Sequence, residues 1–587
     1  MRGTLVGYVA PPPINDAPKG FEQDYYEIEL SRTSIGGGHE QQIAKFTSAE
    51  SYLLPWPSDV PLSSKERCAV RVRAKCVGQD VPITPWSQVV HVEVGLLNKG
   101  DWTAKFITAP WSAEAVNEPQ PEDLFRKEFS LTHDNVYSAR LYISAQGAYE
   151  AELNGRKIGD HFLAPGWTSY HGRLAYQTFD VTDLIDRQEC CLGVRVAEGW
   201  FKGRLGFAGG RRNIWGSRTS LIAQLEIHFV SGEHLTVVTD ETWQTIQGPI
   251  RKAEIYDGEK YDATFEVDGW STYGLQTDNW ICAEVLADTK ACLIASTAEP
   301  VRRIESLKPV QLVETRSGKK ILDFGQNLVG YVRVKSVKGP RGSSVIMSHA
   351  EVLEDGELGI RPLRVCEAQD IYTLRGGNLA ETFEPRFTFH GFRFCQVDGW
   401  PSDDFSLDNF EAVVCHTDME YRGKFSCSNS QLNKLYENIV WGMRGNFLSV
   451  PTDCPQRDER LGWTGDLALF APTAAYIFGC SGIIINWLQD LWYDQLQLGG
   501  VPPMVSPNAL LGDTSWRKPC AIWHDVTILA PWALWEATGD STILARQYDS
   551  MKAWINVIPR DHGRHRHLWD PTLFQLAVSD WYERGHT

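Results

Sequence analysis

The sequence has little positive charge beside its acidic residues, and this imbalance excludes two classes of partner. It carries 57 Lys and Arg against 74 Asp and Glu, which gives a formal net charge of −17. Proteins that bind nucleic acid or anionic membranes present clustered Lys and Arg to phosphate groups. We therefore expect neither nucleic acid nor a membrane as a partner, and a neutral small molecule fits better.

The N-terminal stretch lacks the features of an exported protein. Residues 1–20 have one early Arg but no apolar segment of about 7 to 15 residues, which a secretory signal requires. No Asn begins an N-x-S/T glycosylation site, and the 13 Cys form an odd number without metal-ligand spacing. We expect a reduced, cytoplasmic protein that has no metal site and no cofactor.

The most apolar stretch lacks the continuity of a membrane span. Residues 470–487 include Pro472, Gly479, Gly482 and Asn486, whereas a span needs about 20 consecutive apolar residues. The pattern predicts a buried helix that is interrupted by a turn.

The spacing of apolar residues changes once along the chain. Apolar and polar residues alternate in short runs over the first 415 residues, as in 25–30, 139–144 and 331–334, which is typical of strands. From Leu432 onward the apolar residues recur at three- and four-residue spacing behind a possible capping box at 428–431, which predicts helices.

A chain of 587 residues is too long for one core, since single cores stop growing near about 250 to 300 residues. We expect a small β-sandwich similar to a fibronectin type III module at 1–97, further β-sandwiches at 98–295 and 296–415, and part of an α/α toroid at 416–587. A closed toroid of six hairpins needs about twelve helices, and only about five can be counted here. The expected toroid is therefore incomplete.

Between the first two predicted helices lies a dense group of charges. Residues 451–466 contain four acids, two Arg and one Trp. Glycoside hydrolysis needs one carboxylic acid to protonate the leaving oxygen and one carboxylate to activate water or to attack. Neighbouring carboxylates raise the pKa of one of their number, so this segment is a candidate catalytic loop.

The alternative is a solvated loop held by surface ion pairs. In that case Asp453, Asp458 and Glu459 pair with Arg457 and Arg460, and such pairs are common and weak. The Pro, Gly and Trp residues between the charges favour a shaped loop, because a solvated face does not require them.

The segment resembles the signature of glycoside hydrolase family 78, the α-L-rhamnosidases. The resemblance is carried by Asp453-Cys454-Pro455, Arg457, Glu459, Gly462-Trp463 and Gly465-Asp466. Upstream it extends to 153–155, 165–167, 323–327 and 389–393. It implies N-terminal β-sandwich domains, the second of them jelly-roll-like, followed by a six-hairpin glycosidase domain. The implied activity is release of terminal α-L-rhamnose from rhamnose-containing glycosides by inversion.

The resemblance also assigns roles within the loop. Glu459 corresponds to the general acid, while Asp453, Arg457, Trp463 and Asp466 correspond to residues that bind rhamnose or set the charge around it. Arg457 is suited to donate two hydrogen bonds to sugar hydroxyls or to a carboxylate. Trp463 is suited to pack against the methyl-bearing face of a 6-deoxy sugar, or equally to lie in the core.

Trp523 and Asp525 resemble a second sugar-contacting patch. The alternative is a core Trp beside an Asp that caps a helix. Asp580-Trp581 also resembles a family motif, but the residues around it depart from the pattern.

The second carboxylate is the main departure from the family. There the general base is a Glu that follows a Trp in the later half of the helical domain. In this chain Glu536 also follows a Trp, but the residues after it mark a helix end. We expect the base to lie beyond the end of this chain. Two alternatives remain open: another inverting glycosidase built on an α/α toroid, and a non-catalytic protein that binds rhamnose.

Overall fold

The computed structural model describes residues 22–33, 39–48, 56–77, 82–113, 117–286, 291–510 and 519–558. The motif at 580–581 lies outside the described residues. The chain divides into two compact units, Met1–Thr103 and Ala104–Thr587, which are taken in turn.

The first unit contains one antiparallel sheet in the order β2-β1-β3-β4. Its strands are β1 (Gln23–Thr33), β2 (His39–Phe46), β3 (Arg67–Cys76) and β4 (Val90–Glu93). From Tyr26 to Arg32, every second side chain of β1 is buried, including Ile28 and Leu30, so the alternation that predicted a strand here is confirmed. The fibronectin-like sandwich stays a prediction.

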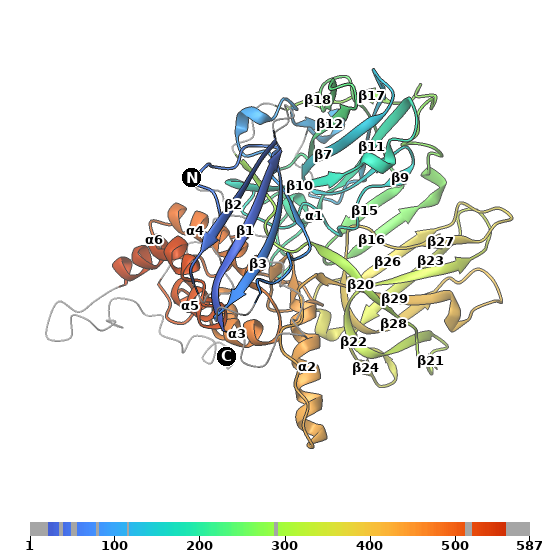
Figure 1. Ribbon diagram of the computed structural model, residues 1–587. Coiled ribbons are helices and arrows are strands. Elements are labelled where there is room, and N and C mark those ends of the chain that lie inside the picture. Colours follow the sequence, from blue (N-terminus) through green and yellow to red (C-terminus); the bar gives the residue numbers. More distant parts are fainter. Residues whose placement is uncertain are drawn as a thin grey trace. The chain divides into compact units, whose positions relative to one another are not determined.

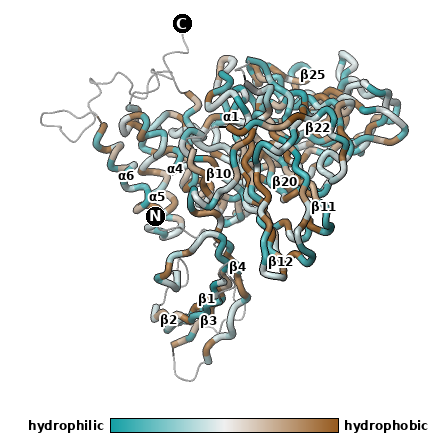
Figure 2. The backbone as a smooth tube through the Cα atoms, turned by 90° about the horizontal axis from the view of Figure 1, so that it is seen from above, coloured by the Kyte–Doolittle hydropathy of each residue, from teal (hydrophilic) through white to brown (hydrophobic). Residues whose placement is uncertain are grey.

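The second unit begins with two sheets that share one apolar core. The first sheet has the order β18-β5-β12-β7-β10-β19, with β13 beside β12, and the second has the order β17-β14-β6-β11-β8-β9. Alternating side chains of β11 and β12 reach the shared core, and apolar and polar stretches alternate along both strands (Figure 2). We call these two sheets the sandwich. Its strands are β5 (Ile107–Thr108), β6 (Asp123–Ser130), β7 (Val136–Gln146), β8 (Ala148–Leu153), β9 (Arg156–Lys157), β10 (Arg173–Asp180), β11 (Glu189–Ala197), β12 (Ser220–Phe229), β13 (His234–Val238), β14 (Gln244–Gln247), β17 (Ile281–Cys282), β18 (Glu284–Val285) and β19 (Cys292–Ala295).

A ten-stranded sheet follows, in the order β15-β16-β26-β23-β28-β22-β29-β20, with β21 and β27 also beside β22. Two of its strands, β15 and β16, precede residue 295 in the chain, and β16 pairs with β26, which follows it. The long strand β22 is irregular between Asp323 and Leu328, so residues 324–327 bulge out of the pairing with β28. The strands are β15 (Ile250–Glu254), β16 (Gly258–Asp262), β20 (Val301–Leu307), β21 (Gln311–Glu314), β22 (Lys320–Val337), β23 (Ser344–Ala350), β26 (Gln369–Thr373), β27 (Glu381–Phe383), β28 (His390–Asp398) and β29 (Phe410–Thr417), and the hairpin β24 (Leu353–Glu354) and β25 (Glu357–Leu358) lies outside the sheet.

Helices complete the second unit, so the predicted order of β domains followed by helices is confirmed. Helix α2 packs against β22 and β29, α5 packs along α3, and α6 packs against α5 and α4 (Figure 1). The long helices are α2 (Ser430–Asn446), α3 (Thr464–Ile477), α4 (Ser481–Gln497), α5 (Val526–Thr538) and α6 (Ser541–Val557). Within the described part of the chain, no helix is both long and apolar enough to cross a membrane.

The starts of α2 and α6 are both capped by side chains. Asn429, not Ser428, caps α2, because its side chain accepts hydrogen bonds from the backbone N–H groups of Gln431 and Leu432. Between α5 and α6, Gly539 has a left-handed conformation, with φ 72°, and Asp540 caps α6.

Candidate active site

Four of the predicted site residues are in contact in the loop between β31 (Val450–Pro451) and α3, residues 452–463, which we call the acid loop. The Glu459 side chain is 8% exposed, and Arg457 Nη2 lies 3.1 Å from its Oε2. The indole Nε1 of Trp463 donates to Oε1 at 3.0 Å. Arg457 Nη2 also lies 3.5 Å from Asp453 Oδ2. The loop thus gathers the two acids, the Arg and the Trp around one carboxylate.

The backbone that carries Glu459 is strained. Glu459 has φ 135° and Arg460 has φ 43°, a region that side-chain-bearing residues rarely occupy. Two contacts hold this backbone: the Tyr256 hydroxyl donates to the Glu459 carbonyl, and Gly206 forms an isolated β-bridge with Glu459. Tyr256 and Gly206 belong to the β part of the unit, so the strain is supported from outside the helical region.

Arg460 is buried and bonds to backbone carbonyls. Its Nη1 donates to Ile255 O at 2.7 Å and to Phe389 O at 2.8 Å, and its guanidinium lies over the Tyr256 ring. The interpretation as a solvated loop therefore fails for this residue, because Arg460 ties the acid loop to the β part of the unit. Asp458 is buried too, and its carboxylate accepts no hydrogen bond from the residues that the structure describes.

Burial shifts the pKa values of two acids near Glu459, Asp453 and Asp466. Burial raises the pKa of Asp453 to about 6, and the neighbouring Glu459 carboxyl adds to the shift, although hydrogen bonds from Cys454 and from Leu461 N–H and the charge of Arg457 oppose it. Burial also raises the pKa of Asp466, which lies in the first turn of α3, and Glu459 adds to the shift. Asp466 is the more exposed of the two.

Two glycines allow close contacts at the start of α3. A Cβ on Gly462 would lie 2.0 Å from the Ser506 carbonyl oxygen. A Cβ on Gly465 would lie 2.7 to 2.9 Å from three atoms of the Trp523 indole. The structure therefore brings Trp523 against the turn that carries Trp463 and Asp466.

Asp525 is engaged at both of its oxygens. Its Oδ2 accepts from the backbone N–H of Ile522 at 2.7 Å, and its Oδ1 accepts from Trp554 Nε1 at 2.9 Å. These bonds connect the start of α5 to α6. The observed role of Asp525 is thus structural, and its sugar-binding role stays a prediction.

One buried group of metal-ligating side chains lies elsewhere in the described residues: His349, Asp370 and His390. The two imidazole rings are stacked, with centroids 4.2 Å and planes 15° apart. Because the lone pair of an imidazole nitrogen lies in the ring plane, one ion cannot be in line with both rings. His390 Nε2 instead lies 3.1 Å from both oxygens of Asp370. The group fits a buried hydrogen-bonded pair better than a shared metal site.

Glu459 has one further partner that the sequence did not predict. Arg364 Nη1 lies 3.0 Å from Glu459 Oε2, so two guanidinium groups contact the same oxygen. Arg364 is 95 positions from Glu459 in the sequence, in the connection between β25 and β26. No local sequence signal marks it, because nothing in the sequence indicates that this connection meets the acid loop.

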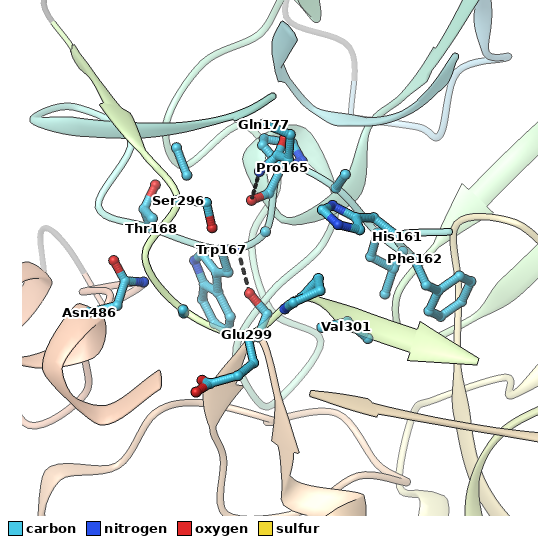
Figure 3. Close-up of a pocket in the computed structure, with 17 residues that line it drawn as sticks. His161, Phe162, Pro165, Trp167, Thr168, Gln177, Ser296, Glu299, Val301 and Asn486 are labelled. Carbon is cyan, nitrogen blue, oxygen red and sulfur yellow. Dashed lines mark hydrogen bonds between the residues drawn. The ribbon is translucent and has the colours of Figure 1, made fainter. Parts of the chain in front are cut away.

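A separate pocket lies between the sandwich and the helical region (Figure 3). It is lined by residues including His161, Gln177, Glu299, Ser449 and Asn486, and by none of the predicted site residues. It offers about 40 Å³ to water molecules, which is room for about three. It is therefore too small for a sugar ring, and the acid loop remains the candidate site.

Comparison with known proteins covers most of the chain. Family models match four segments: a Rha78A-like N-terminal immunoglobulin domain at 13–98, an α-L-rhamnosidase N-terminal domain at 134–305, a concanavalin-like domain of bacterial α-L-rhamnosidase at 313–416, and its 6 hairpin glycosidase domain at 420–587. The last of these contains the whole acid loop.

Individual relatives of this chain are also described as α-L-rhamnosidases. An α-L-rhamnosidase of Streptomyces avermitilis is 40% identical over 465 residues, which are 78% of this chain and 44% of the relative. The crystal structure of native α-L-rhamnosidase from Aspergillus terreus has a TM-score of 0.90 and 43% identity, over 97% of this chain and 64% of that one. A Streptomyces avermitilis α-L-rhamnosidase crystallised with L-rhamnose has a TM-score of 0.84 and 29% identity, over 94% of this chain and 68% of that one.

The chain spans about half the length of the curated relatives it matches. Along that span, the acid loop, the long helices and most strands of the second unit fall within segments that match the family. The chain therefore belongs to the α-L-rhamnosidases of glycoside hydrolase family 78.

Proposed function

We propose that this protein is an inverting glycosidase that releases terminal α-L-rhamnose from rhamnose-containing glycosides, with Glu459 as the general acid. The observation that carries the proposal is the bonding of Glu459 to Trp463 and Arg457 within the segment that matches the glycosidase domain. A carboxyl group held at both oxygens in a buried loop is oriented for proton transfer.

The proposed chemistry follows from the requirements of glycoside hydrolysis. Glu459 gives its proton to the glycosidic oxygen as the bond from that oxygen to the anomeric carbon breaks. A water molecule attacks the anomeric carbon from the opposite face and loses a proton to a second carboxylate. The positive charge that develops on the sugar ring is stabilised by the acids around it.

Asp453 is proposed as a sugar-binding residue and not as the second carboxylate. Inversion places the two carboxyl groups about 6.5 to 9.5 Å apart, so that a water molecule fits between them. Oxygens of Asp453 and Glu459 lie within 4.8 Å of each other, which is too close for that water. Asp453 also accepts a hydrogen bond from Leu461 N–H at 2.9 Å and contacts Arg457.

The remaining residues are proposed to hold the sugar. Asp466 is exposed in the first turn of α3, and Trp523 packs against the Gly465 beside it. A carboxylate next to an indole ring suits a 6-deoxy sugar, which presents hydroxyls on one side and a methyl group on another. We propose that Trp463 contributes to the same surface while its N–H holds the acid.

A panel of nitrophenyl glycosides tests the substrate. In a form of the protein that carries both carboxylates, we expect turnover of the α-L-rhamnoside and no more than background with fucosides and glucosides. Turnover of those sugars in preference would instead indicate another toroid glycosidase. Calorimetric binding of free rhamnose without turnover would indicate a non-catalytic rhamnose-binding protein.

The stereochemistry is tested by proton NMR of the product in the first minutes of reaction. Inversion gives β-L-rhamnose first. Early release of α-L-rhamnose would contradict the mechanism and would identify Asp453 as a candidate nucleophile.

A further inference from the structure

Arg364 reaches the acid from a different part of the fold. It follows the 3-10 helix Arg361–Leu363, which belongs to the connection between β25 and β26. Its Nη1 donates to Glu459 Oε2 at 3.0 Å and lies 3.4 Å from the Asp458 carbonyl oxygen. The connection that leads into the ten-stranded sheet therefore contributes a cation to a site whose other members lie in the acid loop.

The backbone of Arg364 is strained to make this contact. It has φ 58° and ψ −110°, a conformation that a residue with a side chain rarely adopts. The neighbouring residues hold it: Leu363 is buried, and Cys366 Sγ donates to the Tyr256 carbonyl. Tyr256 also bonds to the Glu459 carbonyl, so one residue supports both strained segments.

A purely structural ion pair does not account for this arrangement. The Arg364 side chain is 44% exposed, and a pair with an exposed partner contributes little to stability. The free-energy cost of a strained backbone, about 1 to 3 kcal/mol, exceeds the stabilisation of about 0 to 1 kcal/mol from such a pair. Strain of this kind is typical of functional sites. Stabilisation of the fold therefore does not explain the contact, and an effect on the Glu459 carboxyl group does.

We propose that Arg364 is a positioning residue for the general acid, an inference that rests on the proposed role of Glu459. Trp463 fixes Oε1, and Arg364 together with Arg457 fixes Oε2. With both oxygens held, the carboxyl plane has one orientation toward the glycosidic oxygen. Arg364 acts through Glu459, and its loss tilts the acid without removing it.

Substrates with different leaving groups test this role. Proton donation matters for an alkyl rhamnoside and much less for 2,4-dinitrophenyl rhamnoside, whose leaving group departs unprotonated. For Arg364→Gln we expect kcat/KM to fall about 10- to 100-fold on the alkyl rhamnoside and less than about threefold on the other. Arg364→Lys keeps a cation and should recover most of the loss.

The matched control is Arg361→Gln in the same turn. Arg361 is 83% exposed and pairs with Glu354, away from the acid. This variant should behave as the unchanged protein on both substrates. Equal losses of Arg364→Gln on the two rhamnosides, or no loss on either, would overturn the proposal, because a misfolded or irrelevant residue does not discriminate between leaving groups.

A chemical measurement separates this proposal from the proposed activity. Carbodiimide coupling at Glu459, followed by mass spectrometry, reports how well its carboxyl group is covered, whether or not the chain turns over rhamnosides. We expect Arg364→Gln to increase coupling at Glu459 at least about threefold, since one of two guanidinium partners is gone, and Arg361→Gln to leave it unchanged. Unchanged coupling in Arg364→Gln would refute the positioning contact, whereas increased coupling without any rhamnoside turnover would refute the proposed function alone.

Discussion

The indole N–H of Trp463 lies 3.0 Å from Oε1 of Glu459, and both side chains are buried. Trp463 stands at the boundary between the acid loop and α3, as the residue that precedes the first turn of the helix. The hydrogen bond thus joins the strained backbone at Glu459 to a rigid element. We take it as the main link between the fold of the helical region and the orientation of the acid.

Trp463→Phe tests this link, because it keeps an aromatic ring and removes the donor. A typical intramolecular hydrogen bond contributes about 0.5 to 1.5 kcal/mol, so we expect the free energy of unfolding to decrease by about that amount. We also expect kcat on an alkyl rhamnoside to fall about tenfold. Urea unfolding and steady-state kinetics measure both. Trp532→Phe, on the exposed side of α5, is the control, and equal behaviour of the two variants would contradict the link.

Gly465→Ala tests the contact between α3 and Trp523. The added methyl group meets the indole at 2.7 to 2.9 Å, so the ring must move and we expect KM for the rhamnoside to rise about tenfold or more. Gly442→Ala is the matched control, because Gly442 lies inside α2 with nothing within 4 Å of its Cβ position. That change should raise stability by about 0.5 to 1 kcal/mol. A KM that does not change in Gly465→Ala would show that Trp523 lies outside the sugar site.

Arg460→Gln tests how the acid loop is anchored. The change leaves the carbonyl groups of Ile255 and Phe389 without their buried donor. Leaving a buried acceptor unsatisfied costs about 1 to 3 kcal/mol, and we expect a loss of at least that size in urea unfolding. Arg187→Gln is the control, since Arg187 is exposed and pairs with the neighbouring Asp186. A loss below about 1 kcal/mol for Arg460→Gln would contradict the anchoring role.

The raised pKa of Asp494 leads us to predict how the free energy of unfolding depends on pH. Burial raises its pKa from 3.8 to about 7, while Ser169 and the Asn508 N–H oppose the shift. Because the folded chain binds this proton more tightly than the unfolded chain, the stabilisation is complete below about pH 4 and is lost as pH rises through about 7. The full loss is about 4 kcal/mol.

Asp494→Asn removes that titration. We expect its free energy of unfolding to fall less between pH 5 and pH 8 than that of the unchanged protein, measured by urea at both values. Other buried acids such as Asp123 and Glu259, whose pKa values burial raises to about 6 and about 8, remain in both proteins. Parallel pH dependence in the two would show that Asp494 titrates normally.

The sequence predicted the parts of the site that lie close together in the chain. Asp453, Arg457, Glu459 and Trp463 fall within eleven consecutive positions, and the charges and turn residues of that segment indicate a shaped loop by themselves. The change of apolar spacing near Leu432 likewise predicted where the strands give way to helices.

The supports of that loop were not predictable in the same way. Arg364 and Tyr256 meet the acid loop only through the tertiary packing of the β part of the unit, and Arg460 looked like a partner for acids. Its actual partners are backbone carbonyls, which have no sequence signature. Long-range contacts of this kind depend on the tertiary fold and leave no local pattern.

The central claim is that Glu459 is the general acid, and Glu459→Gln tests it most directly. On an alkyl rhamnoside we expect kcat/KM to fall about 10²- to 10⁴-fold, the usual contribution of general acid catalysis. On 2,4-dinitrophenyl rhamnoside the loss should be below about tenfold, because that leaving group needs no proton. Glu536→Gln, which changes an exposed acid on α5, should match the unchanged protein on both substrates. Equal losses of Glu459→Gln on the two rhamnosides would contradict the account, since they would mean that Glu459 binds sugar or supports the fold instead of donating the proton.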